Sequence, residues 1–341
     1  MLALAAMTLL TLSGSTRAAI ERPVYSPGDR WVYVLEGSMG VPGFNDTENG
    51  TFVLTLAGRV EVEVAGFEDV DVNGTSSRAV RVLTRTSGFI NGTFEVPGFP
   101  TPATVAGTIS SNTSELWEDR GYQTISSEGT SETVLDVVLI FTMRFEFRIR
   151  TFANVSVVQV DPFPLDVNQT TTASLHSDLL VNSTVIAMGN ETSFEERTAF
   201  DSEWRRQALA LEALHVEAGD FSAYRLNQTL SGFPGVPFGG SSPEDYEIAH
   251  FSNDVGFYVK RVAYTNGTPA TEMRLKSYTY AARAPAFPWI PVGILVAAVA
   301  AGIILGLWWR SRRRRDRGTS PTGGAGGPLG PDSGPGGGHA R

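Results

Sequence analysis

The chain has 341 residues, a formal net charge of −9 and no cysteine. This length is sufficient for about two ordinary domains. The acidic balance argues against nucleic acid as a partner, because neutralising phosphates requires a basic surface. Without cysteine there are no disulfides, no thiol chemistry and no Cys-ligated metal sites, so core packing must hold the folded part together.

The N-terminus carries a short apolar run. Residues 2–12 read LALAAMTLLTL, which is too short to span a bilayer and is typical of the core of a signal peptide. No Lys or Arg precedes the run, which departs from the usual pattern. Small residues that follow it suit cleavage between Ser15 and Ala19. We therefore predict an export signal over residues 1–19.

The sequence that follows has the pattern of β-strands. Residues 59–72 (RVEVEVAGFEDVDV) alternate apolar and mostly acidic side chains with a period of two, which is typical of a half-buried strand. Asn-Gly pairs, which favour hairpin turns, begin at Asn49, Asn73, Asn91 and Asn266. Further strands are predicted at residues 79–83, 134–140, 145–149, 156–160 and 259–264.

A weak internal repeat divides this β region. The segment 70–82 matches 216–226, and 116–122 matches 250–257, in the same order along the chain. The alternative is a chance similarity between two β-rich halves.

The repeat has two consequences for the fold. It predicts a mainly β chain with two tandem antiparallel units, at residues 20–160 and 161–284, each a curved sheet, half-barrel or sandwich. It also predicts a strand at residues 208–216, although residues 194–214 have the composition of a helix, because helix propensity is a weak determinant.

Short motifs carry a family resemblance. Residues 27–33 read PGDRWVY, and later segments are VEAGDFSAY at 216–224, GFYVK at 256–260 and LKSY at 275–278. The chain thereby resembles uncharacterised archaeal and bacterial envelope proteins that open with Gly-Asp-x-Trp-x-Tyr, over roughly residues 22–280. The resemblance implies curved antiparallel sheets similar to the half-barrels of lipoprotein carriers and implies no activity. The second unit lacks the Gly-Asp and the Trp.

Asparagine usage is unusual. Eleven of the twelve Asn open an Asn-x-Ser/Thr triplet, the acceptor motif of N-glycosylation. We interpret this as dense glycosylation, although a Thr-rich β protein with Asn in its turns would give some such triplets. Together with the absence of Cys, it favours an archaeal over a eukaryotic cell surface. The predicted glycosylation sites are Asn45, Asn49, Asn73, Asn91, Asn112, Asn154, Asn168, Asn182, Asn190, Asn227 and Asn266.

A membrane helix is predicted near the C-terminus. Residues 289–309 read WIPVGILVAAVAAGIILGLWW, and 21 helical residues extend about 31 Å, enough to cross a bilayer. Trp at both ends suits the two interfaces. Six Arg follow between positions 310 and 317, so the positive-inside rule places the C-terminus in the cytoplasm and the N-terminus outside. We predict a cell-membrane protein with one span.

The flanks and the face of this helix allow further predictions. Residues 285–309 form a Pro-rich junction and the span, and residues 310–341 form a basic, then Gly/Pro-rich disordered cytoplasmic tail. Ala298, Gly302 and Gly306 are spaced by four, which allows close helix–helix approach and a homodimer in the membrane.

Three loops combine Pro-Gly with an aromatic residue. They contain Phe44, Phe99 and Phe238. A Pro-Gly pair encodes a tight turn, in which case these rings point inward. The alternative is that the three rings are exposed and form a binding edge, since exposed apolar patches usually mark contacts.

Catalytic and metal motifs are missing. The four His show no metal-ligand spacing, and no HExxH, G-x-S-x-G, P-loop or dinucleotide fingerprint is present. Residues 69–74 (DVDVNG) match half of a calcium loop, but Val80 stands where a bidentate Glu is required. We interpret them as strand and turn. No metal, cofactor or catalytic residue is predicted.

These observations predict a single-pass, N-glycosylated cell-surface protein with a non-enzymatic binding or envelope-structural role. Its partners would be the membrane and possible cell-surface proteins. One alternative is a carrier of an apolar, lipid-like ligand in a half-barrel. Another is a surface hydrolase, whose catalytic groups would come together only in space.

Overall fold

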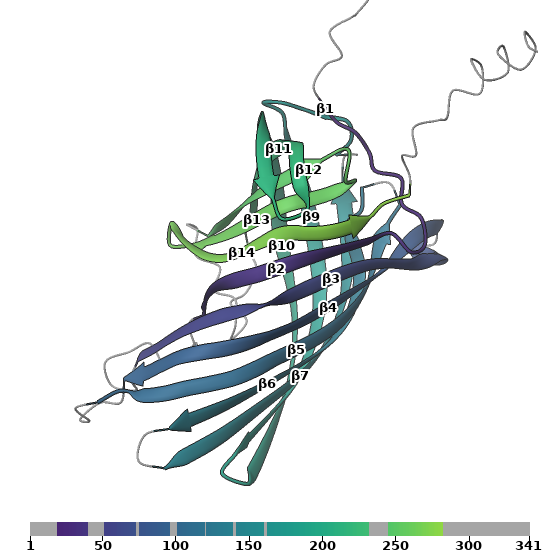
Figure 1. Ribbon diagram of the computed structural model, residues 1–341. Helices are drawn as coiled ribbons and strands as arrows, with labels where there is room; N and C mark the ends of the chain where they lie inside the picture. The colour runs from purple at the N-terminus through teal and green to yellow at the C-terminus, as the bar shows by residue number, and fades with distance from the viewer. Residues whose placement is uncertain are drawn as a thin grey trace, which may run out of the picture. The chain divides into compact units, whose positions relative to one another are not determined.

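The computed structural model describes residues 19–39, 51–72, 75–95, 101–119, 121–138, 141–159, 162–231 and 245–281. These residues belong to one compact unit spanning 1–283. They form a mainly β fold, as predicted, with no helix (Figure 1). The strands are β1 (Ala19–Ile20), β2 (Arg30–Met39), β3 (Thr51–Val72), β4 (Thr75–Glu95), β5 (Ala103–Glu118), β6 (Thr124–Val138), β7 (Thr142–Gln159), β8 (Leu165–Asp166), β9 (Thr170–Ala187), β10 (Asn190–Val216), β11 (Gly219–Ser231), β12 (Tyr246–Ser252), β13 (Phe257–Thr265) and β14 (Thr268–Thr279).

Twelve of these strands close into one antiparallel barrel. Each long strand pairs with the next along the chain, and the ring closes where β14 pairs with β2. The remaining strands, β1 and β8, pair with each other. Closure leaves the barrel with no free first or last strand, so unpaired edges remain only where a strand extends beyond its neighbour.

The two halves of the sequence share this barrel. Residues 20–160 supply β2–β7 and residues 161–284 supply β9–β14, so each half contributes six consecutive strands. The short strands β1 and β8 precede these two sets and meet across the molecule. The halves are therefore two curved walls of one barrel rather than two sheets that each close on themselves.

Alternation of side chains separates an apolar inner face from a polar outer face. On β3, Val60, Val62 and Val64 are buried. The alternate residues Arg59 and Glu61 point outward and form an ion pair with each other. The same period of two continues across neighbouring strands, because register partners lie on the same face. The core is a large cluster on the inner face, with a smaller cluster around β1 and β8.

The motif at residues 28–33 closes one end of the barrel. Trp31 and Tyr33 are fully buried, the Trp31 indole N–H donates to the Val255 carbonyl (3.0 Å), and the Tyr33 hydroxyl donates to the Tyr258 carbonyl (2.8 Å). Both bonds join β2 to the segment that leads into β13. Buried Trp and Tyr need such partners for their polar atoms.

Asp29 ties the beginning of the barrel to its end. Its carboxylate is 1 % exposed and accepts two backbone N–H bonds, from Ser26 and from Ala281, each at 2.8 Å. Ala281 lies two residues beyond the last strand, so one side chain connects the two ends of the folded unit. Gly28 supplies the positive φ of 91° that the turn before Asp29 requires.

Aromatic rings fill the same end. Tyr25 packs on Trp31, Trp117, Tyr122 and Tyr280, with ring centroids 4.7–6.5 Å apart. Burial raises the pKa of the Tyr25 hydroxyl, which donates to the Gly256 carbonyl. This end of the barrel is therefore a packed plug.

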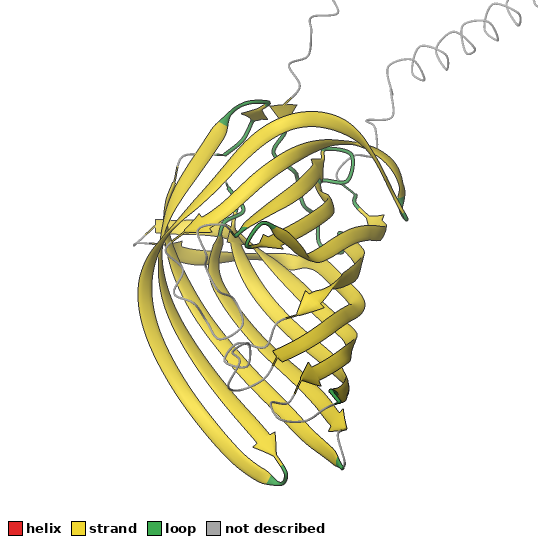
Figure 2. Cartoon of the chain, turned by 90° about the vertical axis from the view of Figure 1, so that its left-hand side faces the viewer, coloured by secondary structure: helices red, strands yellow, loops and turns green. Residues whose placement is uncertain are grey.

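The opposite end is open along one side. β3–β7, β9 and β10 extend beyond the short strands β11–β14 and β2 (Figures 1 and 2). Within the described residues, positions 190–202 of β10 pair with β9 alone, since pairing with β11 begins at Glu203. Phe194 lies on the inner face of this segment and is 59 % exposed. The long strands thus form a trough with a partly exposed apolar lining.

Several local predictions are decided by the strands. The predicted strand at 208–216 is confirmed, because β10 runs from Asn190 to Val216 and the helix-like composition of this stretch does not determine its fold. The Asn266–Gly267 turn is confirmed, with positive φ at both residues. The predicted turn at Asn91–Gly92 is wrong, since both lie inside β4. A Cβ on Gly92 would stand 2.0 Å from the Val53 carbonyl oxygen, so Gly is needed there for close strand approach.

The predicted membrane helix, with Ala298, Gly302 and Gly306, and the tail lie outside the described residues, as does the signal segment up to residue 18. Within the described part of the chain, no helix has the length and apolar character to cross a membrane.

Candidate functional site

Five of the six predicted glycosylation sites that lie within described strands face outward. Asn91, Asn112, Asn154, Asn182 and Asn227 each alternate with residues of the inner face, such as Ile90 beside Asn91 and Leu226 beside Asn227, both fully buried. Independent placement would put at least five of six on the outer face about once in nine arrangements, because side chains alternate between two faces. The sixth site, Asn190, is the first residue of β10 and lies on the same face of that strand as Phe194, at the end of the β9–β10 hairpin. The orientation of the other five is the one that an attached glycan requires.

Exposure separates these sites further. Among the described sites, six are exposed, namely Asn91, Asn112, Asn154, Asn168, Asn190 and Asn266. Asn182 and Asn227 are half-buried, and the Asn227 side-chain oxygen is buried with no hydrogen-bond partner in the described structure. Asn45, Asn49 and Asn73 lie outside the described residues.

Two of the sites line one shallow outer groove. Asn112, Thr130, Arg150 and Asn182 stand in a single cross-strand row over β5, β6, β7 and β9. The groove has a volume of about 450 Å³. Arg150 forms an ion pair with Glu128 (3.0 Å), so the groove carries fixed but exposed charge. Such an open, polar surface is unlike the concave apolar pockets that hold small ligands.

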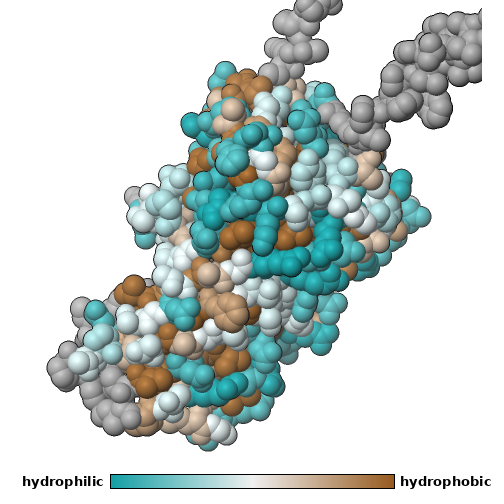
Figure 3. Space-filling model, viewed as in Figure 1, coloured by the Kyte–Doolittle hydropathy of each residue, from teal (hydrophilic) through white to brown (hydrophobic). Residues whose placement is uncertain are grey.

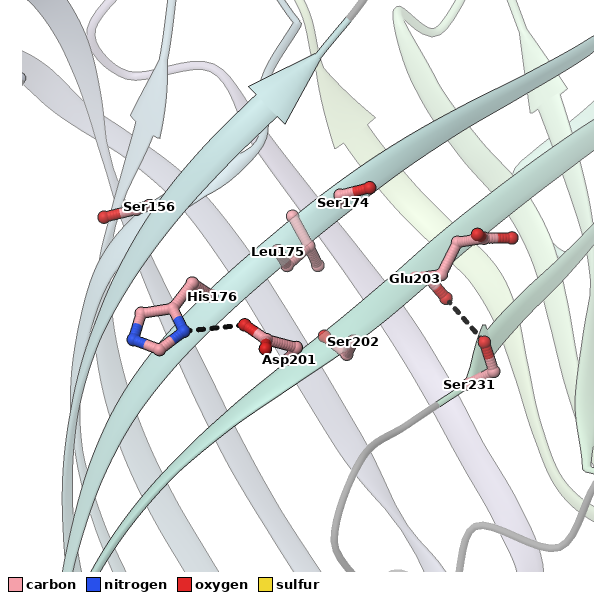
Figure 4. A pocket seen from close by; sticks show the side chains of 8 residues that line it. All are labelled: Ser156, Ser174, Leu175, His176, Asp201, Ser202, Glu203 and Ser231. Carbon is pink, nitrogen blue, oxygen red and sulfur yellow. Dashed lines mark hydrogen bonds and ion pairs between the residues drawn. The ribbon is translucent and has the colours of Figure 1, made fainter.

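A second outer groove holds a Ser–His–Asp row that the sequence did not reveal (Figure 4). Ser156, His176 and Asp201 are register partners on β7, β9 and β10. His176 Nδ1 lies 2.7 Å from Asp201 Oδ1, and this hydrogen bond raises the pKa of the imidazole. Strand register brings these residues together, and nothing in their sequence spacing indicates it.

The geometry of this row does not support nucleophilic catalysis. Figure 4 shows the Ser156 hydroxyl pointing away from the imidazole. The His176 and Asp201 side chains are 56 % and 88 % exposed, so water screens the pair. A catalytic triad needs a hydrogen bond between nucleophile and base, and donors placed for the oxyanion. Ser156 is also the hydroxyl residue of the Asn154 acceptor triplet.

A charged network lies on the inner wall. Arg261 on β13 makes two hydrogen bonds to the Glu247 carboxylate on β12, at 2.9 and 2.7 Å. Burial alone would lower the pKa of Arg261, but the attraction of Glu247 exceeds it and the pKa is raised. Gln228 links this pair to the Tyr258 hydroxyl, and that hydroxyl accepts a bond from Arg206.

This network has the character of a structural link. It joins β10, β11, β12 and β13, and its two carboxylate oxygens are both used by Arg261. A bidentate Arg–carboxylate pair fixes geometry well, and it leaves no free acid or base for catalysis. Its members were not singled out from the sequence, because nothing local distinguishes an inward charged residue from an outward one.

The other two described histidines, His215 and His250, lie in strands β10 and β12. His215 pairs with Asp220 across the β10–β11 hairpin, with 2.7 Å between ring nitrogen and carboxylate. Burial lowers the pKa of His250, whose ring lies 3.4 Å from Glu212. No group of three potential ligands able to hold a metal ion occurs among the described residues. Asp69 and Asp71 of the half calcium loop lie in β3, opposite Arg78 and Ser76 of β4.

The three Phe loops lie outside the described residues, but their flanking strands fix where they connect. Phe44 lies between β2 and β3, Phe99 between β4 and β5, and Phe238 between β11 and β12. β2, β4 and β11 run in the same direction along the barrel wall, because consecutive strands are antiparallel. All three connections therefore leave the end of these strands opposite to Asp29 and Ala281.

Comparisons with known proteins give no relative. No family model, no curated protein and no solved structure matches the chain.

Proposed function

We propose that this chain is an exported, N-glycosylated cell-surface protein with a non-enzymatic binding or envelope-structural role. The outward orientation of Asn91, Asn112, Asn154, Asn182 and Asn227 carries this proposal. A glycan on the inner face would destroy the barrel, so a chain modified at these positions must place them outside. The N-terminal apolar run and the segment 289–309 supply the export route and the single-span anchor.

The direction of the strands gives the barrel two different ends. Asp29 and Ala281 belong to the plugged end, and the chain continues from Ala281 toward the predicted anchor. The connections that contain Phe44, Phe99 and Phe238 belong to the other end. We propose that the end bearing these loops makes the contacts with partners.

Carriage of an apolar ligand is the second candidate. The inner face of β7, β9 and β10 presents Phe147, Val181 and Phe194 along the trough, and Phe194 is 59 % exposed. Large apolar side chains left open on a concave wall are typical of ligand sites. The hydrolase alternative has less support, because the Ser156–His176–Asp201 row is exposed and its Ser points away.

Glycopeptide mass spectrometry of the full chain from its own membrane tests the main proposal. We expect glycan mass on the exposed sites Asn91, Asn112 and Asn154, and lower occupancy at Asn227, whose amide oxygen is buried. Asn253, which opens no acceptor triplet, serves as the internal control. Unmodified Asn at all of the exposed sites would refute glycosylation and with it the proposed location.

Native mass spectrometry and surface cross-linking of the same protein separate the two roles. A carrier should hold an extra mass of lipid size that is lost on denaturation. A binding protein should give a clean mass and a cross-linked partner that disappears when Phe44, Phe99 and Phe238 are all changed to Ser. Retention of the partner by this triple variant would exclude the loops as the binding edge.

A further inference from the structure

One exposed aromatic side chain has no evident role in the barrel. Phe89 lies on the outer face of β4 and is 67 % exposed. Within the described part of the chain, its ring neither stacks on another aromatic ring nor lies under an Arg side chain. Tyr264 and Phe152 make contacts of these two kinds. An exposed Phe costs solubility, and large exposed apolar groups usually mark a contact.

Phe89 stands beside a glycosylation site on the same face. Asn91 and Thr93 follow it at intervals of two residues along a regular strand, so all three side chains point outward. Their Cα atoms are separated by steps of about 6.8 Å, since a strand rises about 3.4 Å per residue. The Phe ring is therefore the nearest large side chain on the N-terminal side of the acceptor amide.

The side chains directly opposite Phe89 and Asn91 on the neighbouring strands carry no charge. Phe89 is flanked across the sheet by Ala57 and Thr108, and Asn91 is flanked by Thr55 and Ala106. These small, uncharged neighbours leave the ring face uncovered. Figure 3 shows apolar patches on the lower part of the visible face, over the long strands of the first half.

The same sequence spacing recurs at other sites. Phe152 precedes Asn154 by two residues, and Tyr264 precedes Asn266 by two. Met188, at 70 % the most exposed large apolar side chain described, precedes Asn190 by two. The rings at 152 and 264 are partly covered by Arg150 (4.5 Å) and Tyr246 (4.6 Å), which leaves Phe89 as the clearest case.

We propose that Phe89 is the platform on which the first sugar of a glycan at Asn91 packs. The electron-rich face of an aromatic ring attracts the weakly positive C–H groups on one face of a pyranose, and the contact removes apolar area of both from water. The sugar covers the exposed ring and fixes the glycan against the wall. This inference rests on the proposed glycosylation of Asn91.

A double-mutant cycle on the full-length glycoprotein tests the contact. The four proteins are the wild type, Phe89→Thr, Asn91→Gln and the double variant, each checked for glycan at Asn91 by peptide mass spectrometry. We expect Phe89→Thr to lower the Tm by about 2–4 °C when the glycan is present and to have no such effect in the Asn91→Gln background. Phe89→Tyr keeps the ring and should keep the wild-type Tm.

A matched control and distinct outcomes complete this test. Phe141 is similarly exposed (63 %) and does not precede an acceptor Asn by two residues, so Phe141→Thr should have the same effect in both backgrounds. An unmodified Asn91 in the wild type refutes the glycan itself. A glycan at Asn91 with an equal effect of Phe89→Thr in both backgrounds overturns the platform alone. A change in oligomer mass on Phe89→Thr, independent of the glycan, would instead assign Phe89 to a protein interface and also overturns it.

Discussion

Trp31→Ala is expected to lower the free energy of unfolding of the barrel by about 3–5 kcal/mol, the usual loss for a buried Trp. The side chain is fully buried against Tyr25, Phe257 and Tyr280, with ring centroids 5.0–6.1 Å away. Its removal opens a cavity in the plug and leaves the Val255 carbonyl without the indole N–H. Thermal unfolding of the purified full chain should show a fall in Tm on the order of 10 °C.

Two variants give this result its control. Trp31→Phe keeps a ring but not the N–H donor, so it should fall between wild type and Trp31→Ala. Val53→Ala removes a side chain that is 59 % exposed and should change the stability by less than about 0.5 kcal/mol. A loss below about 1 kcal/mol in Trp31→Ala would contradict a packed plug at this end.

Asp29→Ala should reduce the free energy of unfolding by about 2–4 kcal/mol, although it removes a polar side chain. The N–H groups of Ser26 and Ala281, which are part-buried in these bonds, both lose their acceptor at about 1 kcal/mol each, the lower limit for an unpaired donor. The cavity left by the buried carboxylate adds to this loss. Urea unfolding followed by fluorescence measures the change. Hydrogen exchange should also show that the amide of Ala281 becomes less protected.

Asp29→Asn distinguishes hydrogen bonding from packing. It retains one acceptor oxygen in nearly the same volume, so its loss should be smaller than that of Asp29→Ala. Glu191→Ala on β10 changes an exposed carboxylate and serves as the control for loss of charge. Equal stability of Asp29→Ala and wild type would show that this carboxylate does not connect the two ends of the barrel.

The local features of the fold could be predicted from the sequence, because each depends on a few neighbouring residues. A strand exposes alternate residues to two environments, so the period of two in residues 59–72 already identifies β3. Turn chemistry at Asn266–Gly267 was equally local. The same dipeptide at 91–92 led to a wrong turn prediction. Gly is required at position 92 because the Val53 carbonyl on the neighbouring strand leaves no room for a Cβ.

The long-range features were not predictable from a single sequence. Pairing of Arg30 with Thr279 closes the ring between residues at opposite ends of the folded unit, and no local pattern encodes that register. The inner Arg261–Glu247 pair and the outer His176–Asp201 pair depend on register in the same way. The acceptor Asn were found from the sequence, but the outward orientation of five of them became visible only with the strands.

The position of Asp29 also affects the mechanical resistance of the barrel to a force that pulls on its C-terminal end. The chain continues toward its C-terminus directly after β14, and β14 lies between β13 and β2. Tension applied at Ala281 along the strand axis loads the hydrogen bonds of both neighbouring ladders in shear, so many bonds share the load at once. The force reaches the barrel at Ala281, whose N–H is bound by the Asp29 carboxylate. Asp29 thereby connects Ala281 to the turn before β2. The first residues of the fold thereby protect the last strand from being peeled away one bond at a time.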